Sequence, residues 1–360
     1  MGSRFSIPVP DDFVFARDLC SYGYFLLAPN RWDPFQRTLT RPLDLENGVA
    51  VVTVAQPGAG EPGEGGRGLL AAAGSPLAVV ADRALSKREK TEAAGLIARM
   101  LSMGDTGVED FHRVDPRWSA KGAGLGRARL SRSPTFFEDV VKTVTSCNIS
   151  WPGTVGMNRR LCAVVNPAFP SPANLARMRA STLRARCGVG YRDARLIELA
   201  RMAEAGELDE HWFTDPANDD ATVYKALLKL PGIGPYGASN IMQLIGRFSR
   251  LAIDTESVRH GRDVLGMTGT DREVQKRLEA HYAGFGDHRF RSYWFEVWAW
   301  YEGRKGPAWT WDPAAVGQSF TAAQFKAEDA AAALAKGKKP ARAKAAPRAA
   351  RAARAGGRRG

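Results

Sequence analysis

The sequence feature that constrains the fold most is a short turn, Pro231-Gly-Ile-Gly-Pro235, between two apolar patterns with helical spacing. Glycine tolerates positive φ angles and lets a backbone approach a bound group closely, so the two glycines suit a sharp reversal of the chain. Pro235 suits the first turn of a new helix. The apolar residues are Val223, Leu227, Leu228 and Leu230 before the turn, and Ile241, Leu244 and Ile245 after it. The segment is therefore predicted to fold as helix, tight hairpin, helix.

The predicted hairpin also indicates a binding property. Its exposed backbone N–H groups and the positive end of the helix that begins at Pro235 are able to hold one phosphate group. Such a contact positions a nucleic-acid backbone and reads no base sequence. The hairpin alone therefore predicts a phosphate contact that reads no base.

A carboxylate follows the second helix, at a point where a further helix is expected to begin. In Leu251-Ala-Ile-Asp-Thr255, an apolar lead-in ends at Asp254. One interpretation makes Asp254 an N-cap, because Asp is among the residues most favoured at that position. The other makes Asp254 catalytic and places it about one helix length from the hairpin. One residue is able to fill both roles.

The rest of the chain divides by its periodicity into four parts. Residues 1–83 predict a small antiparallel β domain, and residues 84–302 predict a mostly helical domain. A helical or irregular extension is expected over 303–335. Residues 336–360 repeat Ala, Lys, Arg and Pro without an apolar face, which predicts a disordered basic tail. The expected fold class is α+β.

Individual elements are marked by β-branched runs and by helix-opening signals. The expected strands are Thr38–Leu45, Gly48–Ala55 and Leu77–Ala81, with a loop by composition over Gln56–Gly68. The expected helix openings are a capping box at Ser86–Glu89, Ser133 with Pro134, and Ser171 with Pro172; an aromatic-rich stretch spans Arg289–Tyr301.

The positive charge of the chain is concentrated at one end. The 51 Lys and Arg residues exceed the 38 Asp and Glu residues, for a formal net charge of +13. Ten of the basic residues and no acidic residue lie in the tail, which leaves a net charge of only +3 on residues 1–335. A tail of this kind predicts a polyanionic partner and adds sequence-independent affinity for DNA.

The cysteines and histidines do not predict a cofactor. The four cysteines, at positions 20, 147, 162 and 187, have no short spacing, which excludes an iron–sulfur cluster held by one local run. The five histidines are dispersed, so no metal site is expected. No apolar stretch approaches the ~18 residues of a membrane span, and no secretory signal is visible at the start. We therefore expect a cytoplasmic protein with reduced thiols, associated with the nucleoid if it is bacterial.

The segment Leu230–Ala238, LPGIGPYGA, followed by Ile253-Asp-Thr255, resembles the signature of the helix-hairpin-helix DNA glycosylase superfamily. The resemblance covers roughly residues 20–300. It extends to Phe136–Arg160, Phe169-Pro-Ser171 and Gly188-Val-Gly-Tyr-Arg192, in the order seen in the 8-oxoguanine glycosylase branch. The N-terminal β domain fits that branch and the bacterial alkyladenine (3-methyladenine) glycosylases.

By position, the resemblance assigns roles to several residues. Asp254 matches the catalytic aspartate, and Asn148 matches the asparagine that fills the gap left by an extruded base. Tyr191 and Arg192 match residues that wedge the duplex open. The hairpin residues Gly232, Ile233, Gly234 and Tyr236 match the DNA-backbone contact, where a monovalent cation is also compatible with the resemblance. The alternatives are a helix cap at Asn148 and ordinary turn or surface residues at Tyr191 and Arg192.

Three positions depart from the 8-oxoguanine branch. Tyr236 stands where bifunctional members carry a lysine that attacks the sugar, and tyrosine cannot form a Schiff base. Asn240 replaces a cysteine of the base pocket. Gly153 replaces an arginine that contacts the base opposite the lesion. The resemblance thus implies a monofunctional enzyme without strand cleavage, and the aromatic ring of Tyr236 is closer to the alkyladenine glycosylases, which stack cationic bases on aromatic rings.

The aromatic stretch Arg289–Tyr301 has two interpretations. Trp and Phe at helical spacing build a hydrophobic core more often than they line a pocket. If part of the stretch lines a base pocket, Trp294, Phe295 and Trp298 are the candidates, together with Tyr236 and Asn240.

The expected function is base excision from damaged duplex DNA by a monomeric enzyme that needs no cofactor. Asp254 would stabilise positive charge on the sugar or activate water, and the substrate would be an alkylated purine. One alternative is a non-catalytic DNA-binding or lesion-recognition protein that keeps the hairpin but has lost the chemistry. A second, in which the basic tail dominates as in architectural chromatin proteins, conflicts with the near-neutral remainder of the chain.

Overall fold

The N-terminal part is built on a five-stranded antiparallel sheet. The computed structural model describes residues 2–58, 72–121 and 125–319, which belong to one compact unit. The strand order is β1-β5-β4-β3-β2. The strands are β1 (Arg4–Ile7), β2 (Arg31–Asp33), β3 (Thr38–Leu45), β4 (Gly48–Ala55) and β5 (Leu77–Ala81). The three predicted strands are confirmed with the predicted bounds. The basic tail and most of the loop predicted over 56–68 lie outside the described residues.

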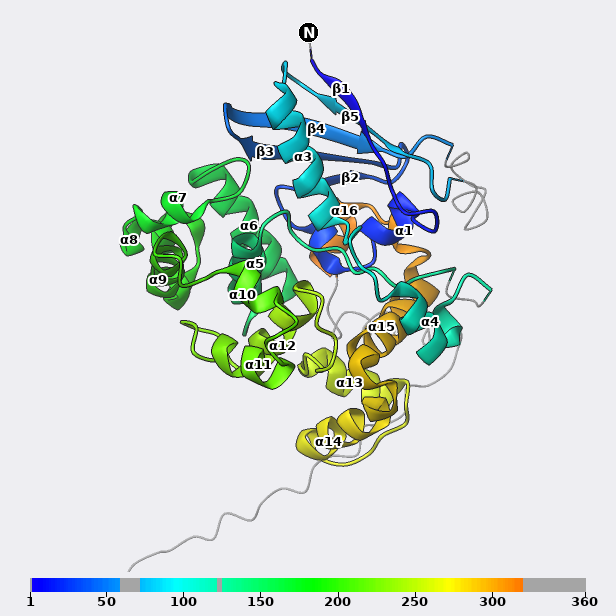
Figure 1. Ribbon diagram of the computed structural model, residues 1–360. Helices are drawn as coiled ribbons and strands as arrows, with labels where there is room; N and C mark the ends of the chain where they lie inside the picture. Colours follow the sequence, from blue (N-terminus) through cyan, green and yellow to red (C-terminus); the bar gives the residue numbers. More distant parts are fainter. Residues whose placement is uncertain (1, 59–71, 122–124, 320–360) are drawn as a thin grey trace, which may run out of the picture. The chain divides into compact units, whose positions relative to one another are not determined.

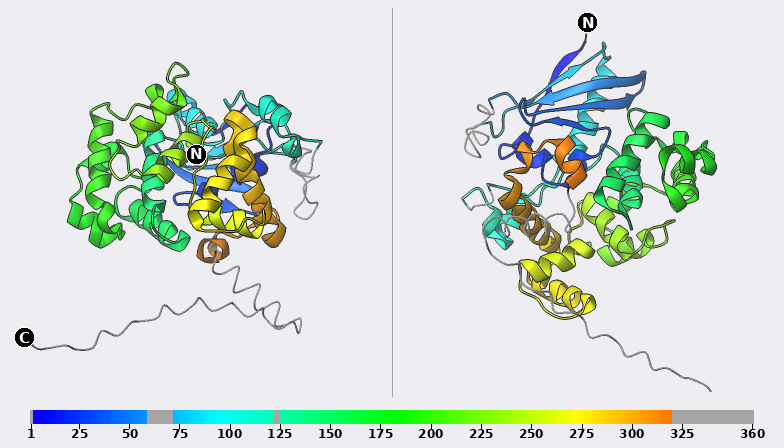
Figure 2. Two further views of the ribbon diagram at one scale, coloured as in Figure 1. Left: turned by 90° about the horizontal axis from the view of Figure 1, so that it is seen from below. Right: turned by 180° about the vertical axis from the view of Figure 1, so that it is seen from behind.

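The remainder of the described chain is mostly helical, which confirms the α+β class. The helices are α1 (Phe15–Leu19), α3 (Lys87–Met100), α4 (Val108–Val114), α5 (Phe136–Ser146), α6 (Trp151–Val164), α7 (Pro172–Ala176), α8 (Ala180–Thr182), α9 (Asp193–Glu204), α10 (Glu210–Thr214), α11 (Asp220–Leu227), α12 (Pro235–Leu244), α13 (Thr255–Asp263), α14 (Asp271–Tyr282), α15 (Arg289–Lys305) and α16 (Pro313–Ser319). Figures 1 and 2 show the helices α5 to α12 grouped on one side below the sheet, and α13 to α15 on the other.

Local capping signals explain several helix starts. Ser86 and Glu89 form the predicted capping box at α3, and Ser171 caps α7 with Pro172 in its first turn. The predicted start of α5 at Ser133 is two residues early. The N-cap of α5 is Thr135, and the Ser133 N–H instead donates to Asp139 Oδ1 at 2.7 Å, which holds Ser133 outside the helix.

The core of the helical part lies between α5, α6, α9, α11 and α12. Their inward faces are fully buried, including Val140 and Val141 of α5, Leu161 of α6, Leu196 of α9, Leu227 of α11 and Ile241 of α12. A buried ion network joins this core to the sheet: Arg41 of β3 contacts Glu138 at 2.6 Å, and Glu138 contacts Lys142 at 2.7 Å. Buried ion pairs of this kind fix geometry more than they add stability. The sheet is thereby tied to the helix whose end carries Asn148.

Candidate active site

The predicted hairpin between α11 and α12 is confirmed. Gly232 adopts φ +79°, and the Ile233 N–H donates to the Leu230 carbonyl at 3.1 Å. The side chain of Ile233 is buried in the helical core, which anchors the turn from the inside. Gly234 is in extended backbone conformation, and α12 begins at Pro235. The chain therefore reverses where the glycine and proline pattern requires it.

The outer side of the hairpin is open and offers hydrogen-bond donors. A Cβ built on Gly234 would meet no atom within 4 Å. Within the described residues, the N–H groups of Gly232 and Gly234 donate no hydrogen bond. The first N–H groups of α12 add further donors, because the initial N–H groups of a helix have no partner inside it. This arrangement is suited to binding one phosphate group.

Asp254 is the N-cap of α13, so the structural interpretation of this carboxylate is confirmed. Its Oδ1 accepts hydrogen bonds from the Ser257 N–H at 2.9 Å and from the Ser257 hydroxyl at 3.1 Å. The Asp254 N–H donates back to the Ser257 Oγ at 3.1 Å, which completes a capping box. The Asp254 side chain is partly buried, and burial raises the pKa of its carboxyl, while the Ser257 N–H and hydroxyl lower it.

A second hydroxyl supports this carboxylate from behind. The Tyr293 OH of α15 lies 2.6 Å from the Ser257 Oγ. When the single hydrogen of the Ser257 hydroxyl is donated to Asp254, the Tyr293 OH is the donor to the Ser257 Oγ. The chain Tyr293–Ser257–Asp254 therefore orients the carboxylate and favours its charged form.

A cluster of aromatic side chains lies beside Asp254. Its members, which we call the aromatic cluster, are Tyr22, Tyr24, Trp151 and Trp294. The ring centroid of Tyr22 is 4.7 Å from that of Trp294 and 4.9 Å from that of Tyr24. Burial and then the charge of Asp254 raise the pKa of Tyr22. Burial, then Tyr22, then Asp254 raise the pKa of Tyr236. The charge of Asp254 is therefore felt by both tyrosines.

Asn240, one of the predicted pocket residues, is a buried hydrogen-bonding centre between α12, α5 and the N-terminal segment. It is fully buried and accepts a hydrogen bond from the Tyr22 OH at 2.6 Å, while its Nδ2 donates to Thr143 Oγ1 at 3.0 Å. Its position in the middle of α12 turns it toward the N-terminal segment. Asn240 therefore fixes the ring of Tyr22 and contributes to the aromatic cluster indirectly.

The aromatic helix α15 divides its large side chains between two faces. Trp294 is partly buried, stacks on Phe290 with a centroid distance of 6.1 Å, and donates from Nε1 to the Ser21 carbonyl. Phe295 is fully buried and packs against Phe111 and Trp118, and Trp298 is buried with its Nε1 bonded to the Cys20 carbonyl. Phe295 is thus a core residue on the side of α15 that faces away from the aromatic cluster, in contrast to its prediction as a pocket wall. Trp298 stacks on Trp294 with a centroid distance of 5.3 Å, so it lies on the same face of α15 as that member of the cluster.

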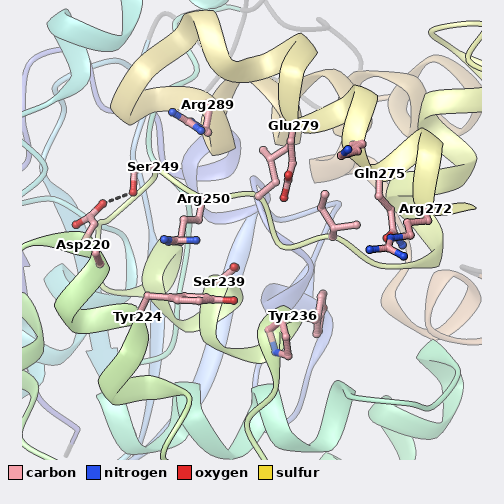
Figure 3. Close-up of a pocket in the computed structure, with 15 residues that line it drawn as sticks. Asp220, Tyr224, Tyr236, Ser239, Ser249, Arg250, Arg272, Gln275, Glu279 and Arg289 are labelled. Carbon is pink, nitrogen blue, oxygen red and sulfur yellow. Dashed lines mark hydrogen bonds between the residues drawn. The ribbon is translucent and has the colours of Figure 1, made fainter.

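A cationic cleft of about 690 Å³ opens between α11, α12 and α14. Tyr236 and Ile253 border it, and Ile253 directly precedes Asp254. Figure 3 shows the guanidinium of Arg250 beside the ring of Tyr224, at 4.0 Å from the ring centroid, with further basic side chains across the cleft. The basic residues that line the cleft are Arg250, Arg272, Lys276 and Arg289, and the acidic ones are Asp220 and Glu279. Ser249 hydrogen-bonds Asp220, which is also paired with Arg247.

The predicted wedge residues behave differently from one another. Asn148 is exposed and adopts a left-handed conformation at φ +52°; it directly follows Cys147, the C-cap of α5, while Ser150 is the N-cap of α6. Tyr191 is 53% exposed. Arg192 is buried and donates to the carbonyls of Val144, at 3.1 Å, and Cys147. Arg192 therefore does not reach DNA; it holds the end of α5 in place, and its prediction as a wedge is wrong.

Several residues of the site were not predicted from the sequence. Tyr22, Tyr24 and Trp151 belong to segments far from the hairpin, and no local pattern marks them. Arg195 of α9 lies against the Tyr191 ring at 5.1 Å, and a Cβ on Gly232 would come within 2.8 Å of its Cδ. Arg195 thus adds a positive charge beside the hairpin. The sequence signal that could have identified Arg195 is its spacing of four residues from Tyr191, at which side chains on a helix lie next to each other.

The described residues contain no group of three or more His, Cys, Asp and Glu side chains placed to bind a metal ion. Across that same part of the chain, none of the helices is long and apolar enough to cross a membrane.

Comparison with known proteins gives similarity in structure rather than in sequence. No protein-family model matches the sequence, and no curated sequence is significantly similar to it. The structure is similar to a 3-methyladenine DNA glycosylase from Archaeoglobus fulgidus, with TM-score 0.56, 16% identity, and coverage of 82% of this chain and 98% of that one. It is also similar to MBOgg1 in complex with a low-affinity DNA ligand (TM-score 0.58, 19% identity, 84% and 98% covered).

A third similar structure is the 8-oxoguanine glycosylase/lyase of Clostridium acetobutylicum, in complex with double-stranded DNA that contains cytosine opposite 8-oxoguanine. Its TM-score is 0.53 at 17% identity, and the match covers 84% of this chain and 98% of that one. The chain therefore has the fold of the helix-hairpin-helix DNA glycosylases.

Proposed function

We propose that this chain is a DNA glycosylase that everts a damaged purine from duplex DNA and hydrolyses its N-glycosidic bond. The observation that carries the proposal is the placement of Asp254. Its carboxylate is fixed by Ser257 and Tyr293, lies beside the aromatic cluster, and adjoins a cationic cleft that the hairpin helix α12 borders. The fold shared with the glycosylases supports the same function.

The carboxylate is the group that this reaction requires. Cleavage of the N-glycosidic bond develops positive charge on the sugar, and a nearby carboxylate stabilises that charge. The same oxygen pair orients or deprotonates the attacking water. Because the capping box holds Asp254 in one rotamer, the charge is preorganised before the substrate enters.

The aromatic cluster supports an alkylated purine as the substrate. A base alkylated at N3 or N7 is electron-poor and cationic, and aromatic rings attract cations through their π faces. Tyr22 and Trp294 present rings beside Asp254, and the carboxylate adds a negative charge on the same side. A base that already carries positive charge leaves without a general acid, so Asp254 acts without a second titrating partner.

The site supports hydrolysis by water without strand cleavage. Tyr236 occupies the position at which an amine nucleophile would stand, and a phenol forms no Schiff base. The lysine buried nearest to the aromatic cluster, Lys142, is paired with Glu138 at 2.7 Å and lies 5.5 Å from the ring centroid of Tyr24. Its ammonium is thus engaged away from Asp254.

Eversion of the nucleotide would be stabilised by the loops on the other side of the hairpin. Asn148 would fill the space that the everted base leaves, and Tyr191 would enter the stack beside it, because both side chains are exposed. The unpaired N–H groups of Gly232 and Gly234 would bind one backbone phosphate.

The proposal is tested by single-turnover incubation with duplexes that each carry one alkylpurine, 8-oxoguanine, hypoxanthine, uracil or ethenoadenine, followed by alkali to cut abasic sites. The expected result is alkali-dependent cleavage at one or more alkylated or deaminated purines. If no lesion is released although the lesion duplexes are bound, the alternative of a non-catalytic DNA-binding protein replaces this proposal.

Gly234→Ala is expected to weaken DNA binding by roughly 10- to 100-fold, because a hydrogen bond from a backbone N–H to a charged phosphate is worth ~1.5–3 kcal/mol and the methyl group keeps the phosphate away. The unfolding temperature should stay the same, since alanine adopts this extended conformation and its Cβ meets open space. The measurement is DNA affinity beside a thermal unfolding curve.

Gly232→Ala is the contrasting variant for the same loop. Alanine at φ +79° costs about 1–2 kcal/mol, so this variant should lower the unfolding temperature. Equal affinity of wild type and Gly234→Ala would show that the outer side of the hairpin does not contact DNA.

Tyr293→Phe is expected to shift the acid limb of the pH–rate profile to higher pH. The wild-type rate should fall as pH decreases through the raised pKa of Asp254, because the protonated carboxyl no longer stabilises the sugar cation. Without the Tyr293 hydroxyl, the Ser257 hydrogen bond to the carboxylate weakens and the charged form is less favoured.

The rate of Tyr293→Phe on the alkaline plateau should equal that of wild type, because the ring and the carboxylate remain. A uniform loss of rate at every pH, with an unmoved acid limb, would mean that Tyr293 acts only in packing.

A further inference from the structure

The helices α6 to α9 carry a surface that is rich in arginine. Residues 159–201, which run from α6 into α9, hold nine arginines, no lysine and only two acidic residues, for a net charge of +7. Because residues 1–335 have a net charge of only +3, the rest of that stretch has a net charge of −4. Seven of the nine arginines are exposed, and we call them the arginine surface: Arg159, Arg177, Arg179, Arg184, Arg186, Arg195 and Arg201.

The charges of the arginine surface are not neutralised within the described part of the chain. Of the seven arginines, only Arg184 forms an ion pair with a described residue, Asp193, at 2.8 Å. A solvated helix face commonly carries acidic and basic side chains three or four residues apart, where they form pairs. Here like charges lie together and repel one another, and a bound anion relieves that repulsion. The arginine surface is therefore suited to an anionic partner.

The segments that carry the arginine surface are packed on one another. α9 contacts α7 and α8, and the π-helical turn Leu183–Cys187 contacts α6 and α8. Figure 1 shows α7, α8 and α9 together at one side of the helical part, next to α6. Arg195 lies 5.1 Å from the centroid of the Tyr191 ring, and a Cβ on Gly232 would meet its side chain. The arginine surface is thus continuous with the hairpin.

The region that follows the arginine surface in the chain has the opposite charge. Residues 202–224, which run from the end of α9 into α11, hold seven acidic residues and neither lysine nor arginine. Five of the seven are exposed: Glu204, Glu207, Asp209, Asp215 and Asp219. α11 leads from this acidic region to the hairpin. A phosphate backbone at the hairpin is therefore attracted toward one region and repelled from the other.

We propose that the arginine surface binds the phosphate backbone of one arm of the duplex, beyond the base pairs that contact the hairpin. The proposal rests on the proposed function, which places the duplex on the hairpin. Arginine suits this partner because its guanidinium stays charged and donates two parallel hydrogen bonds to a phosphate. Such contacts read no base. The protein therefore requires more base pairs on one side of the lesion than on the other.

The first test is the salt dependence of affinity for an undamaged duplex. Arg177→Gln/Arg179→Gln/Arg186→Gln removes three exposed charges that form no ion pair with the described residues. Each phosphate contact contributes about −0.9 to the slope of log affinity against log salt, so the slope of this variant should be shallower by about 2.7. From about 50 to 200 mM salt, wild-type affinity should then fall about 40-fold more than that of the variant.

Arg4→Gln/Arg31→Gln/Lys87→Gln is the matched control. It removes the same charge from exposed positions on β1, β2 and α3, which likewise form no ion pair within the described part of the chain. Its salt slope should equal that of wild type, and both variants should keep the wild-type unfolding temperature. An equal change of slope in the two variants would overturn the proposal, because the loss of net charge alone would then explain it.

The second test uses duplexes with a tetrahydrofuran abasic-site analogue and shortens either arm in turn. Wild-type affinity should fall when one arm is shortened and stay nearly constant when the other is, and the Arg177/Arg179/Arg186 variant should bind both shortened duplexes alike. Equal dependence of wild type on the two arms, or an asymmetry that the variant keeps, would overturn the proposal. Neither test requires excision, so failure of the lesion panel with an intact salt effect would refute the enzymatic function only.

Discussion

Asp254→Asn should reduce the single-turnover rate of base release by about 1,000-fold, the loss found when one preorganised electrostatic group is removed from a reaction centre. Asparagine has nearly the same shape and is as good an N-cap as aspartate, so α13 should remain intact. Affinity for a lesion duplex should be retained, because the phosphate and wedge contacts do not involve this residue.

The same substitution should raise stability at neutral pH. Burial raises the folded-state pKa of Asp254, so folding favours the protonated carboxyl, and the charged carboxylate weakens the folded state above the unfolded-state pKa. Asp254→Asn removes that charge. Thermal unfolding should show a higher midpoint than wild type near pH 7, and the difference should vanish in acid, where the wild-type carboxyl is protonated in both states.

Asp254→Glu is the control that keeps the negative charge but changes its position. It keeps the carboxylate but moves it by one methylene group, so its base release should remain slow despite the correct charge. An Asp254→Asn variant that releases bases at the wild-type rate would exclude this residue from the chemistry.

Trp294→Ala should lower excision of a cationic alkylpurine by about 30-fold, since one aromatic stacking or cation–π contact is worth ~1–3 kcal/mol. Excision of a neutral lesion such as hypoxanthine should fall less, because only stacking is lost. The measurement is single-turnover excision of both lesions at saturating enzyme. An equal loss for the two lesions would contradict the role of charge in recognition.

Phe295→Leu is the matched control on the adjacent position of α15. Phe295 is fully buried against Phe111 and Trp118, away from the aromatic cluster. This variant should lower the unfolding temperature and leave the rate per folded molecule unchanged for both lesions. A rate loss as large as that of Trp294→Ala would show that the two faces of α15 do not separate core from pocket.

The hairpin and the Asp254 cap were predictable because their signals are local. Two glycines between prolines permit one backbone path, and a carboxylate after an apolar run is a common helix start. The strands Thr38–Leu45 and Gly48–Ala55 were predictable for a similar reason: β-branched alternation and a short connection define a hairpin of strands. In each case the residues that decide the structure are within a few positions of one another.

The aromatic cluster was not predictable, because its members come from distant segments. Tyr22 reaches the site through a hydrogen bond to Asn240, 218 positions later in the chain. In α15 seven of the 17 residues are aromatic and are distributed around the helix among charged residues, so the sequence pattern marks no polar face. Adjacent residues such as Trp294 and Phe295 differ by about 100° around the helix. Similarly, nothing near Arg192 in sequence shows that its guanidinium turns inward.

The most direct test of the central claim is base release by wild-type enzyme in the presence of sodium borohydride, with the strand analysed before and after alkali. Hydrolysis assisted by Asp254, without an amine nucleophile, predicts a released base, an intact strand until alkali is added, and no covalent protein–DNA adduct. A trapped adduct would contradict the claim and would direct attention to Lys276, the lysine that lines the cleft.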